Sequence, residues 1–331
     1  MPARVLMDVD TGIDDAIAIM IALQSPEIEI VGITTVSGNV TAGAAGLNTL
    51  GILRALGKES KIPVLQGSSR PISKKIVRAK DVHGEKGLGN MTLESNPSLL
   101  QKGKVSHFIS RILANYRKDE VSLIATGPLT NIARIILEDP GNIDSLSGIC
   151  IMGGTYGLAS KIYGNITQYA EFNFYCDPKA AQIVLAHTSD KAVQLNVVGL
   201  DVTDKYLIID DKFVSRLSDP QCMKGKKTAL GYSSKVPIIA KSLLEYPLAK
   251  FGKFDLPDIF AVAMLESPDL FKFKRGKINI VQNGLLRGHS TFVEENSSDN
   301  IEKGRKIFIA SKIMDRKRFH KYVFSHLCNG R

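Results

Sequence analysis

The chain has 331 residues, of which 44% are hydrophobic and 23% are charged, as is ordinary for a globular protein with a large core. The net charge is +10, but the lysines and arginines are scattered without an aromatic-interleaved basic motif, so we expect no nucleic-acid partner. No apolar run reaches the roughly 18 residues that span a bilayer, so we expect no membrane segment. The four cysteines match no zinc-binding spacing, and the N-terminus runs directly into a predicted strand, so we expect a reducing, cytoplasmic location.

The N-terminal stretch 5–20, VLMDVDTGIDDAIAIM, predicts a strand, an acidic turn and the start of a helix. It places four carboxylates within eight residues: Asp8, Asp10, Asp14 and Asp15. Like charges this close repel one another, and an oxygen-ligated divalent cation would offset the repulsion. The helix dipole alone could account for Asp14 and Asp15, but not for Asp8 and Asp10 at the strand end. The stretch therefore favours a metal site with chemistry attached.

Strand-like apolar segments then alternate with helical periodicity. Further strands are predicted over 28–36, 62–65, 121–126, 147–152, 192–198, 277–281 and 306–309. Helices are predicted over 41–56, 105–116, 129–137, 178–186, parts of 210–245, 260–265 and 315–327. The stretches 67–96 and 155–170 lack periodicity and are predicted to be loops. A loop as long as the first is usually functional or disordered.

This alternation predicts one α/β domain over residues 1–331, with a mostly parallel, Rossmann-like central sheet and helices on both faces. Ligands of such sheets lie beyond the carboxyl ends of the strands. Polar residues follow the predicted strands at Asn39, Thr126, 165–173 and Asp258. Each alone has a structural explanation, such as a turn at Asn39 or a helix N-cap at Asp258. Together they predict one shared site.

The motif DVDTGIDDAIAI resembles the DxDxGxDDAxAI signature of the inosine–uridine-preferring nucleoside hydrolase family. Further family-like motifs follow in order: VSGNV at 36–40, HGEKGLGN at 83–90, ATGPLTNIA at 125–133, MGG at 152–154, AEFNFYCDPKAA at 170–181 and LRG at 286–288. They cover nearly the whole chain. The resemblance implies the nucleoside hydrolase fold and hydrolysis of the N-glycosidic bond of ribonucleosides to free base and ribose, as in nucleoside salvage.

The resemblance also implies residue roles. Ca²⁺ would be held by Asp10, Asp15, the backbone carbonyl of Thr126, and Asp258. It would lower the pKa of a bound water, whose proton Asp10 takes as general base. The substrate-binding residues would be Asp14, Asn39, Asn165, Glu171, Phe172, Asn173 and Asp258, with Asp8 in support. The C–N bond would break through an oxocarbenium-like transition state. Because relatives are commonly dimers or tetramers, we expect a homodimer or homotetramer.

One departure from the family pattern concerns the leaving base. Many members carry a histidine directly before the late aspartate, where it helps to protonate the base, but Pro257 occupies that place here. His83 matches a family histidine near the base pocket and is a candidate catalytic residue, although a solvated loop histidine explains it equally well. Tyr232 is a weaker candidate. The base preference stays open between inosine, uridine, cytidine and a modified nucleoside.

Two other functions are consistent with parts of the sequence. DVDTG resembles the start of haloacid-dehalogenase-type phosphatases, in which the first aspartate, here Asp8, would attack phosphate with Mg²⁺. That alternative leaves Asp14, Asp15 and the EFN segment unexplained. The other alternative is a nucleoside- or ribose-binding protein that has lost catalysis, and its only support is Pro257.

Overall fold

The chain folds around a single sheet in a computed structural model that describes residues 1–158, 163–187, 193–219, 222, 235–295 and 307–328. Within these residues the strands are β1 (Ala3–Val9), β2 (Ile28–Thr35), β3 (Val64–Gln66), β4 (Leu100–Lys102), β5 (Val121–Ala125), β6 (Gly148–Met152), β7 (Leu195–Val198), β8 (Phe271–Ile280), β9 (Ser290–Glu294) and β10 (Ile307–Ile313). Their spatial order is β4-β3-β2-β1-β5-β6-β7-β10-β8-β9. Neighbours from β4 to β10 pair in parallel, and β8 runs antiparallel to β10 and β9. The predicted mostly parallel α/β sheet is confirmed.

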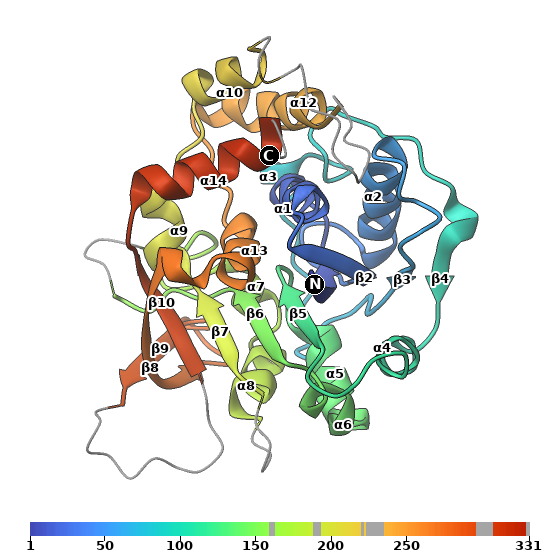
Figure 1. Cartoon of the computed structure of the whole chain (residues 1–331). Helices are drawn as coiled ribbons and strands as arrows, with labels where there is room; N and C mark the ends of the chain where they lie inside the picture. The colour runs from blue at the N-terminus through green and yellow to red at the C-terminus, as the bar shows by residue number, and fades with distance from the viewer. Residues whose placement is uncertain (159–162, 188–192, 220–221, 223–234, 296–306, 329–331) are drawn as a thin grey trace.

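Helices cover both faces of the sheet, as predicted (Figure 1). On one face lie α1 (Ile13–Gln24), α2 (Ala42–Ala55), α9 (Leu200–Tyr206), α10 (Asp211–Leu217), α12 (Lys235–Phe251), α13 (Asp258–Glu266) and α14 (Arg316–Cys328). On the other lie α4 (Val105–Leu113), α5 (Thr130–Glu138), α6 (Pro140–Asp144) and α8 (Pro178–Ala186). Each face has its own buried cluster: Val5 and Met7 of β1 belong to the first, and Leu6 between them to the second. A strand buried on both faces reads as a continuous apolar run, which is why 5–7 contains no polar residue.

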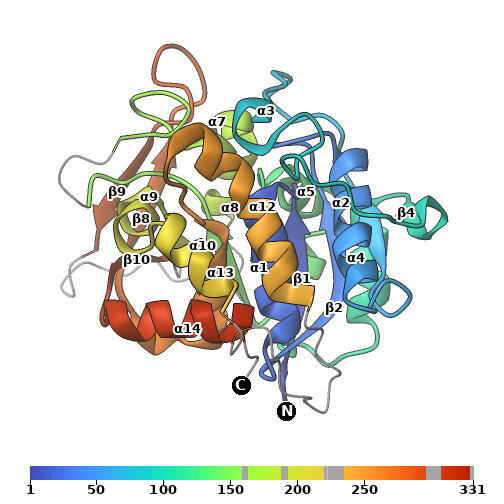
Figure 2. The same cartoon turned by 90° about the horizontal axis from the view of Figure 1, so that it is seen from above.

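Short elements lie at the carboxyl end of the sheet, opposite the two termini (Figure 2). They include α3 (Lys80–His83) and α7 (Phe172–Cys176), and the chain also forms the 3₁₀ turns η1 (Pro97–Leu99) and η2 (Pro268–Leu270). The sequence analysis predicted none of these elements, nor β4 and β9. They are three to five residues long, too short to show a period. The predicted strand 277–281 was placed too late, because β8 begins at Phe271. Residues 192 and 306 of two predicted strands lie outside the described residues.

The cysteines divide into a disulfide pair and two buried thiols. Cys222 and Cys328 form a disulfide across 106 residues, which the sequence analysis did not predict because connectivity cannot be deduced from spacing. Cys150 and Cys176 are buried free cysteines. Among the described helices, none combines the length and the apolar character needed to cross a bilayer.

A buried polar cluster links the end of α1 to α13 and α14, on the face of the sheet that these three helices cover. The carboxylate of Glu266 accepts hydrogen bonds from Ser25 Oγ and Tyr322 Oη, both at 2.8 Å, and His326 Nε2 lies 3.2 Å from it. Burial alone would raise the pKa of Glu266, but these hydrogen bonds and the charge of His326 together lower it below its ordinary value.

We expect Glu266→Gln to lower the free energy of unfolding by about 1–3 kcal/mol at pH 7, because buried hydrogen-bonding groups lose their charged partner. A carboxylate whose pKa is lowered by folding adds to the free energy of unfolding above its unfolded-state pKa of about 4.3. This contribution is lost as the pH falls through the folded-state pKa. Urea unfolding of both proteins should therefore show a smaller difference at acidic pH. Glu245→Gln on the exposed side of α12 is the matched control and should change little. An equal difference at both pH values would contradict the assignment.

Candidate active site

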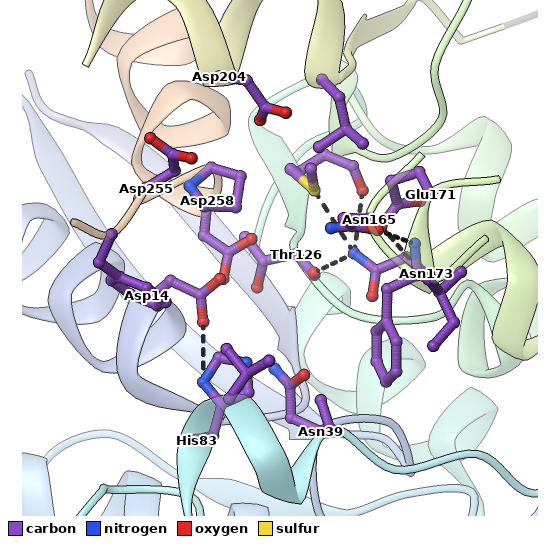
Figure 3. Close-up of a pocket in the computed structure, with 18 of the residues that line it drawn as sticks. Asp14, Asn39, His83, Thr126, Asn165, Glu171, Asn173, Asp204, Asp255 and Asp258 are labelled. Carbon is purple, nitrogen blue, oxygen red and sulfur yellow. Dashed lines mark hydrogen bonds and ion pairs between the residues drawn. The ribbon is translucent and has the colours of Figure 1, made fainter. Parts of the chain in front are cut away.

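A pocket of about 390 Å³ opens at the carboxyl ends of the strands (Figure 3). Nine of the predicted site residues line it: Asp14, Asn39, His83, Thr126, Asn165, Glu171, Phe172, Asn173 and Asp258. The other two, Asp10 and Asp15, have no exposed surface and are not among the lining residues. The structure therefore gathers residues that are up to 244 positions apart in sequence (from 14 to 258) around one cavity.

Asp15, at the start of α1, is held by four hydrogen bonds. Its Oδ1 accepts from the backbone N–H of Asp10 (3.3 Å) and from Thr126 Oγ1 (2.7 Å). Its Oδ2 accepts from the N–H of Gly12 (2.9 Å) and from Asn39 Nδ2 (3.2 Å). The carboxylate thus ties together the segments that follow β1, β2 and β5.

One carboxylate oxygen of Asp10 is fixed by a hydrogen bond, and the other has no hydrogen-bond partner among the described residues. Its Oδ2 accepts from the N–H of Asn39 at 2.5 Å, whereas Oδ1 has no hydrogen-bond partner among the described residues. The backbone at Gly38 approaches so closely that a Cβ there would collide with Oδ2. Glycine is therefore required in the VSGNV motif, and the buried Oδ1 is available to a proton or a cation.

The carboxylates form a cluster that could hold a metal ion. One oxygen from each of Asp14, Asp15 and Asp258 lies within 4.8 Å of the other two. Burial raises the pKa of Asp14 and Asp15 to about 6, and the charge of Asp14 adds to the shift of Asp15. Burial and then the neighbouring carboxylates raise the pKa values of Asp10 and Asp258 well above the ordinary range. A bound cation would offset both effects.

The donor set fits a hard divalent cation. Asp258 Oδ2, like Asp10 Oδ1, has no hydrogen-bond partner among the described residues. The carbonyl oxygen of Thr126 accepts from Asn173 Nδ2 at 2.7 Å and retains a second lone pair. All of these donors are oxygens, as Ca²⁺ and Mg²⁺ require. The closest group of three includes Asp14, which the family resemblance assigns to ribose.

The segment 165–173 forms the opposite wall and is built around Glu171. This residue is the N-cap of α7, and its carboxylate accepts from the N–H groups of Gly154 (2.9 Å), Asn173 (2.6 Å) and Phe174 (3.0 Å). Burial outweighs these bonds and raises the pKa of Glu171 to about 7. Asn165 Oδ1 accepts from the N–H of Phe172 (2.8 Å), which holds the loop against the helix start.

His83 is a buried pocket residue, so the alternative of a solvated loop histidine is wrong. Only 4% of its surface is exposed. Its Nδ1 accepts from the N–H of Ile13 (3.1 Å) and lies 3.7 Å from Asp14 Oδ1. Burial lowers the pKa of His83 to about 4, so the ring is neutral at pH 7 and carries its proton on Nε2.

Asp8 is hydrogen-bonded to β2 and α5 and does not line the pocket. Its Oδ1 accepts from Thr34 Oγ1 (2.5 Å) and Asn131 Nδ2 (2.7 Å), and burial raises its pKa to about 7. Asp8 is 1% exposed and is not among the residues that line the pocket. Such a carboxylate cannot reach a phosphate bound there, so the structure gives the phosphatase alternative no support.

The pocket also contains charged residues that the sequence analysis missed: Arg78, Asp81, Asp204, Lys253 and Asp255. Burial raises the pKa of Asp204 to about 6 and that of Asp255 to about 7. Neither carboxylate lies in a recognisable motif or directly after a predicted strand, so the sequence carried no signal for them. Pro257 lines the pocket, and Tyr232 lies outside the described residues.

Structural comparison places this fold, with its carboxylate cluster at the carboxyl edge of the sheet, among the nucleoside hydrolases. The fold is similar to that of a plant nucleoside hydrolase, the PpNRh1 enzyme, with a TM-score of 0.83 and 26% identity over 99% of each chain. It is also similar to a purine-preferring ribonucleoside hydrolase from Gardnerella vaginalis, with a TM-score of 0.80 and 25% identity over 98% of each chain.

The sequence relatives agree with this class. Uridine nucleosidase 1 from Arabidopsis thaliana is 33% identical over 290 residues, covering 87% of this chain and 81% of the relative. The pyrimidine-specific ribonucleoside hydrolase RihA from Citrobacter koseri is 34% identical over 297 residues, covering 89% of each. The model of the inosine-uridine preferring nucleoside hydrolase family matches residues 5–321, and the chain belongs to this family.

The carboxylate cluster predicts an unusual pH dependence of stability without metal. Raised pKa values mean that the folded state binds more protons than the unfolded chain. The free energy of unfolding then falls as pH rises from about 4 toward the folded pKa values of about 6 for Asp14 and Asp15. In EDTA we expect Tm to decrease between about pH 5 and pH 7. CaCl₂ should reverse the decrease, by about 2.7 kcal/mol at one hundred times Kd.

Two variants make this test specific. Asp258→Asn should remove most of the CaCl₂-dependent rise in Tm, because it deletes a charge from the cluster. Asp119→Asn is the control: Asp119 is exposed and lies before β5, at the opposite end of the sheet. A Tm in EDTA that increases over this pH range would contradict the assignment of the cluster.

Proposed function

We propose that this ribonucleoside hydrolase is Ca²⁺-dependent and cleaves the N-glycosidic bond by water attack at C1′, giving free base and ribose. The observation that carries the proposal is the buried Oδ1 of Asp10, which has no hydrogen-bond partner in the described part of the chain and lies beside the cluster of Asp14, Asp15 and Asp258. Asp10, Asp15, Asp258 and the Thr126 carbonyl would hold the ion, and Asp14 has an oxygen within 4.8 Å of one on Asp15 and one on Asp258. Ca²⁺, when bound, supplies positive charge that favours deprotonation of the attacking water.

Asp10 acts as the general base in this proposal. Its Oδ1 has no hydrogen-bond partner among the described residues and would accept the proton, and Oδ2, which accepts from the N–H of Asn39, retains a second lone pair for the ion. The single hydrogen bond keeps the side chain in one orientation while the proton moves. Protonated Asp10 is stable in the site because burial already favours its neutral form.

The polar walls would hold the ribose and stabilise its charge. Asn39, Asn165, Glu171 and Asn173 line the pocket with amide and carboxylate oxygens. Several of these side chains are fixed by backbone hydrogen bonds, so they are oriented before substrate binds. Positive charge develops on the sugar as the C–N bond breaks, and negative or dipolar oxygen groups around it lower that energy.

The names of the relatives support uridine and inosine as the first substrates to test. Relatives named for uridine and pyrimidine nucleosides favour uridine, and a structural neighbour named for purines keeps inosine in the panel. We also propose a homodimer or homotetramer and a cytoplasmic location. In a reducing compartment the Cys222–Cys328 disulfide would have to resist reduction.

The function is tested with a panel of inosine, uridine and cytidine, with release of ribose measured by a reducing-sugar assay. We expect release with CaCl₂ and little with EDTA. Asp10→Asn should lower kcat on the order of 10²–10⁴-fold, because the water loses its general base. Asp119→Asn should match the wild type. Tight nucleoside binding without ribose release would favour a binding protein that has lost catalysis.

His83→Ala tests the role of the buried histidine. A neutral imidazole that donates one hydrogen bond from Nε2 is worth about 1 kcal/mol, so we expect kcat/KM for uridine and inosine to fall by several-fold to about tenfold. His107→Ala, on the exposed side of α4, is the control. Unchanged hydrolysis of both nucleosides by His83→Ala would remove His83 from the mechanism.

A further inference from the structure

Cleavage of a nucleoside needs a proton donor for the leaving base, and Pro257 in the pocket cannot supply one. A purine or pyrimidine leaves poorly unless a proton reaches it as the C–N bond breaks. Proline has no side-chain proton, and its ring nitrogen is part of the peptide bond. His83 lies against Ile13 and Asp14 near the start of α1. In Figure 3 it is on the opposite side of Asp14 and Asp258 from Asp204 and Asp255.

Asp204 and Asp255 bring two carboxylates to the other side of the pocket. Asp204 belongs to α9, and Asp255 lies in the turn between α12 and α13, two residues before Pro257. Both line the pocket and are half-buried. Thr203 Oγ1 donates to Asp204 Oδ1 (3.1 Å), whereas the Asp255 carboxylate accepts no hydrogen bond from the described residues and faces the cavity with Asp204 (Figure 3).

Burial and the charge of Asp204 favour the protonated form of Asp255. Burial raises its pKa to about 7, the charge of Asp204 adds to the shift, and Lys253 in the same turn opposes it. Burial and the charge of Asp201 raise the pKa of Asp204 to about 6. The charge of Asp204 in turn adds to the raised pKa of Glu171 at the start of α7. Arg78 and Asp81 face the same cavity from the segment at α3. A donor with a pKa near the working pH is the most effective general acid.

We propose that Asp255 is the general acid that protonates the departing base, and that Asp204 is a positioning residue that keeps the proton on it. The inference rests on the proposed nucleoside hydrolysis. The C1′–N bond breaks and its electron pair stays on the base, which receives the Asp255 proton on a ring nitrogen or carbonyl oxygen. The water oxygen bonds to C1′, and its proton passes to Asp10. Solvent returns that proton to Asp255 over the cycle, so the net reaction consumes one water.

The test compares substrates that differ in their need for a proton. p-Nitrophenolate leaves from p-nitrophenyl β-D-riboside without protonation, whereas uracil and hypoxanthine do not leave readily without it. We expect Asp255→Asn to lower kcat/KM for uridine and inosine on the order of 10²–10⁴-fold and to leave the p-nitrophenyl riboside rate nearly unchanged. The retained rate also shows that the variant is folded. Asp119→Asn should match the wild type on all three substrates.

The pH profile tests the role of Asp204. Wild-type nucleoside hydrolysis should decline as pH rises above about 7, since the donor loses its proton, and the p-nitrophenyl riboside rate should lack this decline. Asp204→Asn removes a neighbouring negative charge, lowers the pKa of Asp255 and should move the decline to lower pH. Equal losses on all substrates, or unchanged nucleoside hydrolysis by Asp255→Asn, would overturn the inference. A wild type that cleaves none of the three substrates would instead overturn the proposed function.

Discussion

The carboxylate of Asp15 accepts hydrogen bonds from Asp10, Gly12, Asn39 and Thr126, and the arrangement of the site depends on this set of contacts. The contacts span the ends of three neighbouring strands, since β1 lies between β2 and β5 in the sheet. A negative charge so buried is unfavourable unless it is hydrogen-bonded, so the four donors both stabilise Asp15 and fix the loops that supply them. The strand order therefore decides which side chains meet at the pocket.

The same burial favours a bound cation. Asp10, Asp14 and Asp258 lie buried near Asp15. Desolvation raises the pKa of all three, and repulsion from neighbouring carboxylates adds to the shifts of Asp10 and Asp258. Hydrogen bonds within the protein satisfy some of the oxygens but leave one on Asp10 and one on Asp258 unpartnered among the described residues. The two apolar clusters, one on each face of the sheet, stabilise the fold and offset the cost of burying these carboxylates. The active site is therefore locally unfavourable on its own, as is common where charge is needed for chemistry.

The sequence predicted the sheet and the deep part of the pocket because both leave local patterns. Apolar runs followed by polar residues mark strand ends, and the DVDTGIDDAIAI motif marks the acidic turn. The missed features are long-range. Asp204 and Asp255 become neighbours only when α9 meets the turn before α13, and the Glu266 cluster requires α14 to pack against α1 and α13. Short elements such as α3 were not predicted, because four residues are too few to show a helical period. It is nevertheless α3 that brings His83 into the pocket.

The groups proposed to activate the water and those proposed to protonate the base lie on different parts of the chain. This separation explains how Pro257 is compatible with the proposed reaction. The acidic turn, Asn39 and Thr126 belong to the central strands, whereas Asp204 and Asp255 belong to a helix and a turn over one end of the pocket. Pro257 is compatible with the start of α13, since its φ of −62° is the value that proline imposes. It therefore presents Asp258 to the cluster without disturbing the groups proposed to activate the water. In the proposed reaction the proton for the base comes from Asp255, which lies in the same turn, two residues before Pro257.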